Sequence, residues 1–158
     1  MNESGSLAVL VPGIELFAIL REAFERDPDA VVALTTSGTS MYPMLRDRKD
    51  VVYLKKLSAP PKKYDVVLFQ RNSGAYVLHR VVGVEPDGTC VFCGDNQTVL
   101  ERISDSNQLV AIVQSFQRGC LKIVCQHSIY YRLFSRILTK TRSLRVMLSI
   151  VKRIIRKE

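Results

Sequence analysis

The segment that decides the fold reads Val66-Val-Leu-Phe-Gln-Arg-Asn-Ser-Gly-Ala-Tyr76-Val-Leu-His-Arg-Val-Val-Gly-Val-Glu-Pro-Asp-Gly-Thr-Cys90-Val-Phe92. It contains three runs, 66–70, 76–84 and 90–92, which are rich in valine and aromatic residues and are typical of short β-strands. Asn72-Ser-Gly74 and Pro86-Asp-Gly88 interrupt these runs with residues that favour turns. The segment therefore predicts short strands that are joined by turns in a mostly antiparallel sheet.

The same pattern continues on both sides of this segment. Further strands are expected at Ala30–Thr35, Asp50–Leu54 and Leu109–Phe116. Many short strands at this spacing indicate a compact antiparallel sheet or barrel. We therefore predict a mainly β domain over residues 31–117, in which the sheet closes into a barrel-like fold.

Helical periodicity marks the two ends of the chain. Apolar residues at helical spacing predict an N-terminal helix over Ile14–Arg26, within a helical segment at 1–30. From Ile129 onward the period is helical again, with a further segment over Leu144–Ile155. The residues at 118–158 are therefore expected to form a tail of basic amphipathic helices.

The positive charge of the chain is concentrated in this tail. Of the net charge of +8 over 158 residues, 118–158 contribute +10, whereas 1–117 carry −2. Basic amphipathic helices bind anionic lipid surfaces, so an anionic membrane surface is the expected partner of residues 129–157. Binding to a partner protein, or packing of the apolar stripes on the sheet, are the alternatives. Nucleic acid is disfavoured as a partner because the tail contains no motif of a known nucleic-acid-binding fold.

Nothing in the sequence predicts export or a membrane span. The first twenty residues contain no Lys or Arg, and charges interrupt every tail window of the ~20 residues that a spanning helix needs. We expect a cytoplasmic protein, or one that is peripheral at the cytoplasmic membrane.

Four cysteines raise the question of a metal site. The Cys90-Val-Phe-Cys93 spacing occurs in zinc and redox motifs. In a strand, however, residues three apart point to opposite faces. Cys120 and Cys125 are spaced differently, without a matching knuckle glycine. We expect reduced thiols, no metal and no cofactor.

The chemistry is expected in the segment Ser37-Gly-Thr-Ser-Met-Tyr-Pro-Met-Leu45, between the first two strands. Such a turn can expose a serine hydroxyl beside backbone N–H groups, which a nucleophile and its oxyanion hole require. Ser40 is therefore the candidate nucleophile. The candidate oxyanion and substrate turn consists of Gly38, Thr39, Met41 and Pro43.

Two downstream segments supply the partners that a serine nucleophile needs. His79 interrupts an otherwise apolar strand, and Gly94-Asp95-Asn96 places an acid at the edge of the sheet. Histidine can take the serine proton, and an acid can fix the histidine tautomer. Arg80, by contrast, is expected to form a structural ion pair.

These three segments together resemble the three boxes of type I signal peptidases, in the superfamily of serine proteases that includes the SOS-repressor autoproteases. The boxes are Gly38-x-Ser40-Met41-x-Pro43-x-Leu45, His79-Arg80-Val81-Val82 and Gly94-Asp95-Asn96, within residues 31–116. Histidine at position 79, rather than lysine, is similar to the archaeal and endoplasmic-reticulum branch. The resemblance also extends to small bacterial signal-peptidase-like proteins.

The resemblance implies a signal-peptidase-like β fold and a Ser–His endopeptidase acting on a peptide or preprotein. Ser40 would be the nucleophile and His79 the general base. Two acids qualify as the orienting residue: Asp95 lies in the Gly-Asp-Asn box, whereas Glu101 lies at the offset of the triad acid in the Ser–His branch. Gly94 and Asn96 would be structural members of the box.

The chain departs from the family pattern in three ways. Gly38 replaces the serine that often helps to hold the oxyanion, so a backbone donor such as the Ser40 N–H must suffice. Neither the usual N-terminal anchor nor a membrane-facing hydrophobic insertion is evident. A catalytically inactive peptide- or membrane-binding module of the same fold is therefore the alternative. An autoproteolytic regulator is disfavoured, because no DNA-binding domain precedes residue 31.

Overall fold

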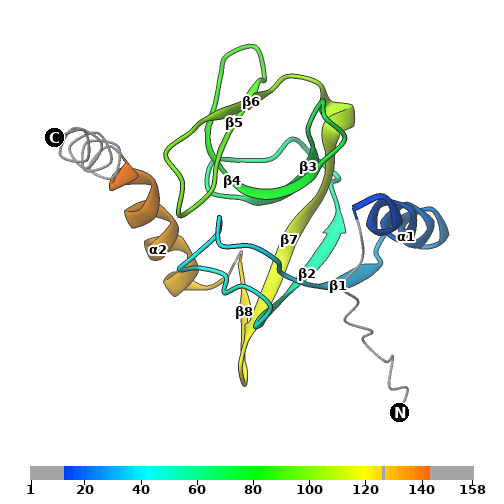
Figure 1. Ribbon diagram of the computed structural model, residues 1–158, viewed down its shortest axis with the longest axis horizontal. Helices are drawn as coiled ribbons and strands as arrows, with labels where there is room; N and C mark the ends of the chain where they lie inside the picture. The colour runs from blue at the N-terminus through cyan, green and yellow to red at the C-terminus, as the bar shows by residue number, and fades with distance from the viewer. Residues whose placement is uncertain (1–12, 126, 143–158) are drawn as a thin grey trace, which may run out of the picture.

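The computed structural model describes residues 13–125 and 127–142 and has the expected mainly β architecture (Figure 1). An eight-stranded antiparallel sheet is flanked by one helix near each end of the described chain. The helices are α1 (Gly13–Arg26) and α2 (Ile129–Lys140). The strands are β1 (Val31–Thr35), β2 (Asp50–Lys56), β3 (Val66–Gln70), β4 (Tyr76–Val84), β5 (Cys90–Cys93), β6 (Glu101–Ile103), β7 (Leu109–Arg118) and β8 (Leu121–Val124).

The sheet has the strand order β1-β2-β7-β3-β4-β5-β6, and β8 pairs with β7. The two turns that were predicted around β4 form as hairpins. Gly74 and Gly88 occupy positive φ angles of 83° and 89°, which glycine adopts without strain. β2 and β3 each shift register against β7, and such irregularities bend and twist a sheet.

The core is divided by β3, whose first four residues are all buried. Val66 and Leu68 belong to the larger cluster, which also contains Leu20 and Phe24 of α1. Val67 and Phe69 belong to the smaller cluster with Phe92 of β5. Because alternate side chains of a strand point to opposite faces, β3 packs against both clusters. This explains why its first four residues are all apolar.

Two strands were not predicted from the sequence. β6 has only three residues and begins with Glu101-Arg102, and β8 is largely exposed. β8 lies inside the segment 118–158, so the residues expected to form a helical tail begin with a strand of the sheet. The tail helix predicted from Ile129 is confirmed as α2, whereas the segment Leu144–Ile155 lies outside the described residues.

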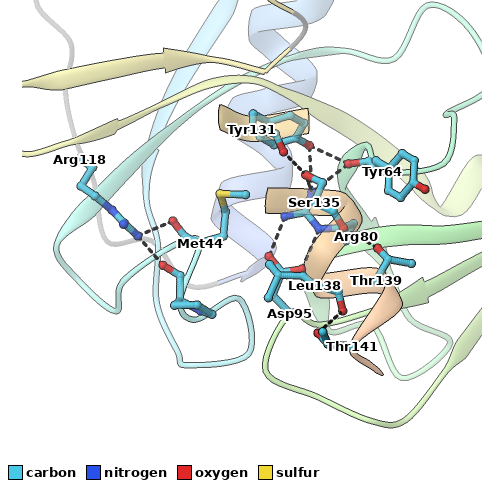
Figure 2. A network of polar contacts seen from close by, with 11 residues as sticks. Met44, Tyr64, Arg80, Asp95, Arg118, Tyr131, Ser135, Leu138, Thr139 and Thr141 are labelled. Carbon is cyan, nitrogen blue, oxygen red and sulfur yellow. Dashed lines mark hydrogen bonds and ion pairs between the residues drawn. The ribbon is translucent and has the colours of Figure 1, made fainter. Parts of the chain in front are cut away.

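Helix α2 attaches to the sheet through a buried ion pair (Figure 2). Arg80 of β4 binds both carboxylate oxygens of Asp95 at 2.7 Å, and both side chains are almost completely buried. The remaining Arg80 nitrogen donates to Ser135 Oγ at 2.8 Å and to the Tyr131 hydroxyl at 3.2 Å, both on α2. It also donates to the Tyr64 carbonyl. Arg80 is thus a structural residue, as expected, and it joins the sheet to the helix.

Within the described residues, no helix combines the length and apolar character needed to cross a membrane.

Replacing Arg80 by Met should lower the free energy of unfolding by about 3–5 kcal/mol, because Asp95 would remain buried without its counter-charge. Arg102→Met is the matched control. It removes an exposed pair with Glu85, at 3.0 Å, and should cost less than about 1 kcal/mol. Urea denaturation of the variants measures both changes. Equal losses in the two variants would contradict the assigned role of Arg80.

Candidate active site

The turn that carries Ser40 is anchored to the core by buried apolar side chains. Met41, Met44 and Leu45 are all at most 5% exposed and belong to the larger core cluster. At the end of the turn, Arg46 binds the buried carboxylate of Asp50. Pro43, which follows a cis peptide bond, lies between these anchors.

Arg118 of β7 also holds this turn, a role that no local sequence pattern indicates. Its guanidinium donates to the carbonyls of Pro43 and Met44, the latter at 2.7 Å (Figure 2). It also lies 3.5 Å from Asp50. The turn is therefore held by contacts that are distant in sequence.

The Gly94-Asp95-Asn96 box contacts the carbonyl of Ser40 itself. The Asn96 N–H donates to this carbonyl at 2.8 Å. A Cβ atom on Gly94 would lie only 2.7 Å from the same oxygen, so only glycine allows this approach. The Asn96 side chain also donates to the Thr39 carbonyl. Gly94 and Asn96 thus hold the serine turn against the end of β5.

Ser40 and His79 line the same cleft, which has a volume of about 470 Å³. Ser40 is half-buried, whereas His79 on β4 is only 1% exposed. The cleft wall contains apolar side chains from several elements, including Leu16 of α1 and Leu34 of β1. Next to Leu16, Phe17 stacks on Tyr76 with ring centroids 5.5 Å apart. The fold therefore brings the two central candidates to one cleft with both polar and apolar walls.

Glu101 is the acid that faces His79. Its Oε1 lies 2.9 Å from His79 Nδ1, close enough for an ion pair, but off the direction of an aligned ring N–H hydrogen bond. Asp95, the other candidate, instead binds Arg80 through both oxygens. His79 and Arg80 are neighbours on a strand and point to opposite faces, so their acids lie on opposite faces as well. The geometry therefore favours Glu101 as the orienting acid.

Arg71 binds Glu101 and is a site residue that was not predicted from the sequence. It follows β3 and forms a two-pronged contact with Glu101, with Nη2 2.7 Å from Oε1 and Nε beside Oε2. These hydrogen bonds lower the pKa of the Glu101 carboxyl, which stays ionised. Arg71 also lines the cleft. No local pattern links two residues that are thirty positions apart.

The surroundings of His79 keep its imidazole neutral near pH 7. Burial lowers its pKa below 6.5, because a charged ring is poorly solvated there. The Glu101 charge works against this effect, whereas the Arg71 charge adds to it. A neutral ring whose Nδ1 faces a carboxylate leaves Nε2 free to accept a proton.

The backbone near Gly38 limits which groups can hold an oxyanion. The Gly38 N–H already donates to Asp47 at 2.7 Å, and the Tyr42 N–H donates to the Thr39 carbonyl. Among the described residues, the Ser40 N–H has no acceptor. It is therefore one of the donors that remain available in this turn, together with the N–H groups of Thr39 and Met41.

The cysteines lie apart from this arrangement. Cys90 and Cys93 are both buried in β5, and within the described residues neither takes part in a disulfide. In the described part of the chain, no three His, Cys, Asp or Glu side chains come together as a metal-binding group.

No family model, curated protein or solved structure matches the chain.

Two substitutions should move the pKa of His79 in opposite directions. Glu101→Gln removes the charge that raises it and should lower the pKa further, whereas Arg71→Met removes a positive charge and should raise it. The chain has only two histidines, so NMR titration of the imidazole signals can follow each one, with exposed His127 as the internal control. An unchanged His79 titration in both variants would contradict the assigned contacts.

Proposed function

We propose that the protein is a serine endopeptidase of the Ser–His type that resembles signal peptidases. One observation carries the proposal: Ser40 and a buried, neutral His79 share one cleft, while Glu101 lies 2.9 Å from Nδ1 of the His79 ring. An activated serine nucleophile requires a nearby histidine base and an acid beside that base, and these residues are the types needed for those roles. The order and residue types of the three sequence boxes support the same conclusion.

In the proposed reaction, His79 Nε2 takes the proton of Ser40 as Oγ attacks the scissile carbonyl. The oxyanion of the tetrahedral intermediate is held by the Ser40 N–H. His79 then gives the proton to the leaving amine, and the peptide bond breaks to leave an acyl-enzyme. Water, activated by the same histidine, hydrolyses the ester and restores Ser40. Glu101 stabilises the imidazolium during both steps, and Arg71 positions Glu101.

The proposed substrate is an extended peptide or preprotein segment. β1 lies at one end of the strand order, and among the described residues no strand pairs with its outer edge. This edge could therefore accept a further strand from a substrate. The end of β1 and the following Ser37 line the cleft next to Ser40. A peptide added to this edge would gain main-chain hydrogen bonds and place its side chains in the cleft.

One observation favours a second candidate, a peptide-binding module without catalysis. Position 38 has no hydroxyl, and its N–H group is already bound to Asp47. An oxyanion in this turn would therefore have fewer donors than in a site with an additional serine hydroxyl, and each donor contributes about 10²–10³ in rate.

Labelling with a fluorophosphonate distinguishes the two candidates. Wild type should form a covalent adduct at Ser40, and Ser40→Ala should form none. Ser37→Ala is the matched control, because this neighbouring serine lines the same cleft. His79→Gln should slow labelling by about 10²–10⁴-fold through loss of the base. If wild type is not labelled, or if folded Ser40→Ala is labelled equally, the endopeptidase proposal is wrong and the peptide-binding module is favoured.

The pH dependence supplies a further test of the base. Because the pKa of His79 is lowered, the ring is neutral above about pH 6.5 and gains a proton only at lower pH. The labelling rate should therefore stay constant down to this region and fall at more acidic pH. Arg71→Met should move this acidic limb to higher pH. A limb that stays in place would show that another group controls the rate.

A further inference from the structure

Helix α2 presents its apolar side to the solvent. Ile129, Leu133 and Ile137, which form the apolar stripe, are 72%, 59% and 48% exposed. Tyr130 beside them is 46% exposed. Four-residue spacing places the members of the stripe along one face of the helix. An exposed stripe of this kind on a basic helix marks an interaction surface.

The opposite face of α2 explains this orientation. Tyr131, Ser135 and Leu138 are the buried residues of the helix, and the first two bind Arg80. The Tyr131 hydroxyl also donates to the Tyr64 carbonyl at 2.7 Å. Turning the helix to bury its stripe would remove these partners from a buried guanidinium, which is costly. The buried contacts of Tyr131 and Ser135 therefore keep the apolar stripe of α2 on the solvent side.

A row of positive charges flanks the apolar stripe. Arg132, Arg136 and Lys140 are exposed and again four residues apart, which places them along a neighbouring line of the helix. The helix contains no acidic residue. The exposed side of α2 therefore combines the apolar stripe with a basic row over the full length of the helix.

We propose that α2 binds an anionic phospholipid surface and lies parallel to it. The apolar stripe would enter the boundary between headgroups and acyl chains, while the basic row would contact the phosphates. A nucleic acid would match the charges but would leave Ile129, Leu133 and Ile137 in contact with water or phosphate. An anionic lipid surface offers apolar acyl chains to the apolar stripe and phosphates to the basic row. This complementarity favours lipid over nucleic acid as the partner of α2. The proposal is independent of the proposed protease activity.

Tryptophan fluorescence can test insertion of the stripe directly, because the chain has no tryptophan. Leu133→Trp places a single reporter on the stripe, and Val99→Trp places one at a site that is 70% exposed and outside α2. With phosphatidylcholine vesicles that contain about one third phosphatidylglycerol, the emission of the first variant should shift to shorter wavelength. The emission of the second should stay unchanged. No shift at position 133, or equal shifts at both positions, overturns the proposal.

Vesicle flotation of the full chain tests the charges. Arg132→Gln with Arg136→Gln should weaken binding to the phosphatidylglycerol vesicles by about tenfold or more, since each basic residue contributes ~1 kcal/mol. Lys49→Gln with Lys62→Gln removes the same charge from exposed sites elsewhere and should have no such effect. Equal losses in the two pairs, or equal binding to pure phosphatidylcholine, overturn the proposal. A wild-type dimer that Leu133→Ser converts to a monomer would identify a second copy as the occupant.

Discussion

The alternation of side chains along β4 determines how the molecule is organised. His79 and Arg80 are consecutive, so one points toward the cleft and the other toward α2. Both are almost completely buried, and each has a carboxylate beside it. Glu101 lies beside the histidine, and Asp95 binds the arginine. A single pair of residues thus connects the candidate active site with the attachment of the C-terminal helix.

The Gly94-Asp95-Asn96 box acts mainly as a structural joint. Gly94 leaves room for the carbonyl of Ser40 and Asn96 donates to it, whereas Asp95 holds Arg80 and through it α2. The box therefore secures the nucleophile turn and the helix at the same end of β5. Glu101 is a separate residue on β6, and Arg71 keeps it in place from the end of β3. Supporting contacts from different strands hold the candidate groups within a rigid sheet.

Periodicity and turn residues predicted much of the fold. The long apolar runs became β3, β4 and β7, and the glycines of two predicted hairpins occupy positive φ angles. β6 and β8 were not predicted, because three or four residues with exposed charges show no clear period. For the candidate site, local motifs identified Ser40 and His79. Arg71 and Arg118 could not be found this way, because they act on groups far away in sequence.

The sequence by itself determined the type of fold, the candidate nucleophile and base, and the position of the basic residues. These follow from local patterns of polarity and from residue chemistry. Only the tertiary structure shows that Glu101, and not Asp95, lies beside His79, because this depends on which face of β4 each carboxylate reaches. It also decided which side of α2 is exposed. Helical spacing defines two faces, but the buried guanidinium of Arg80 selects the one that packs inward.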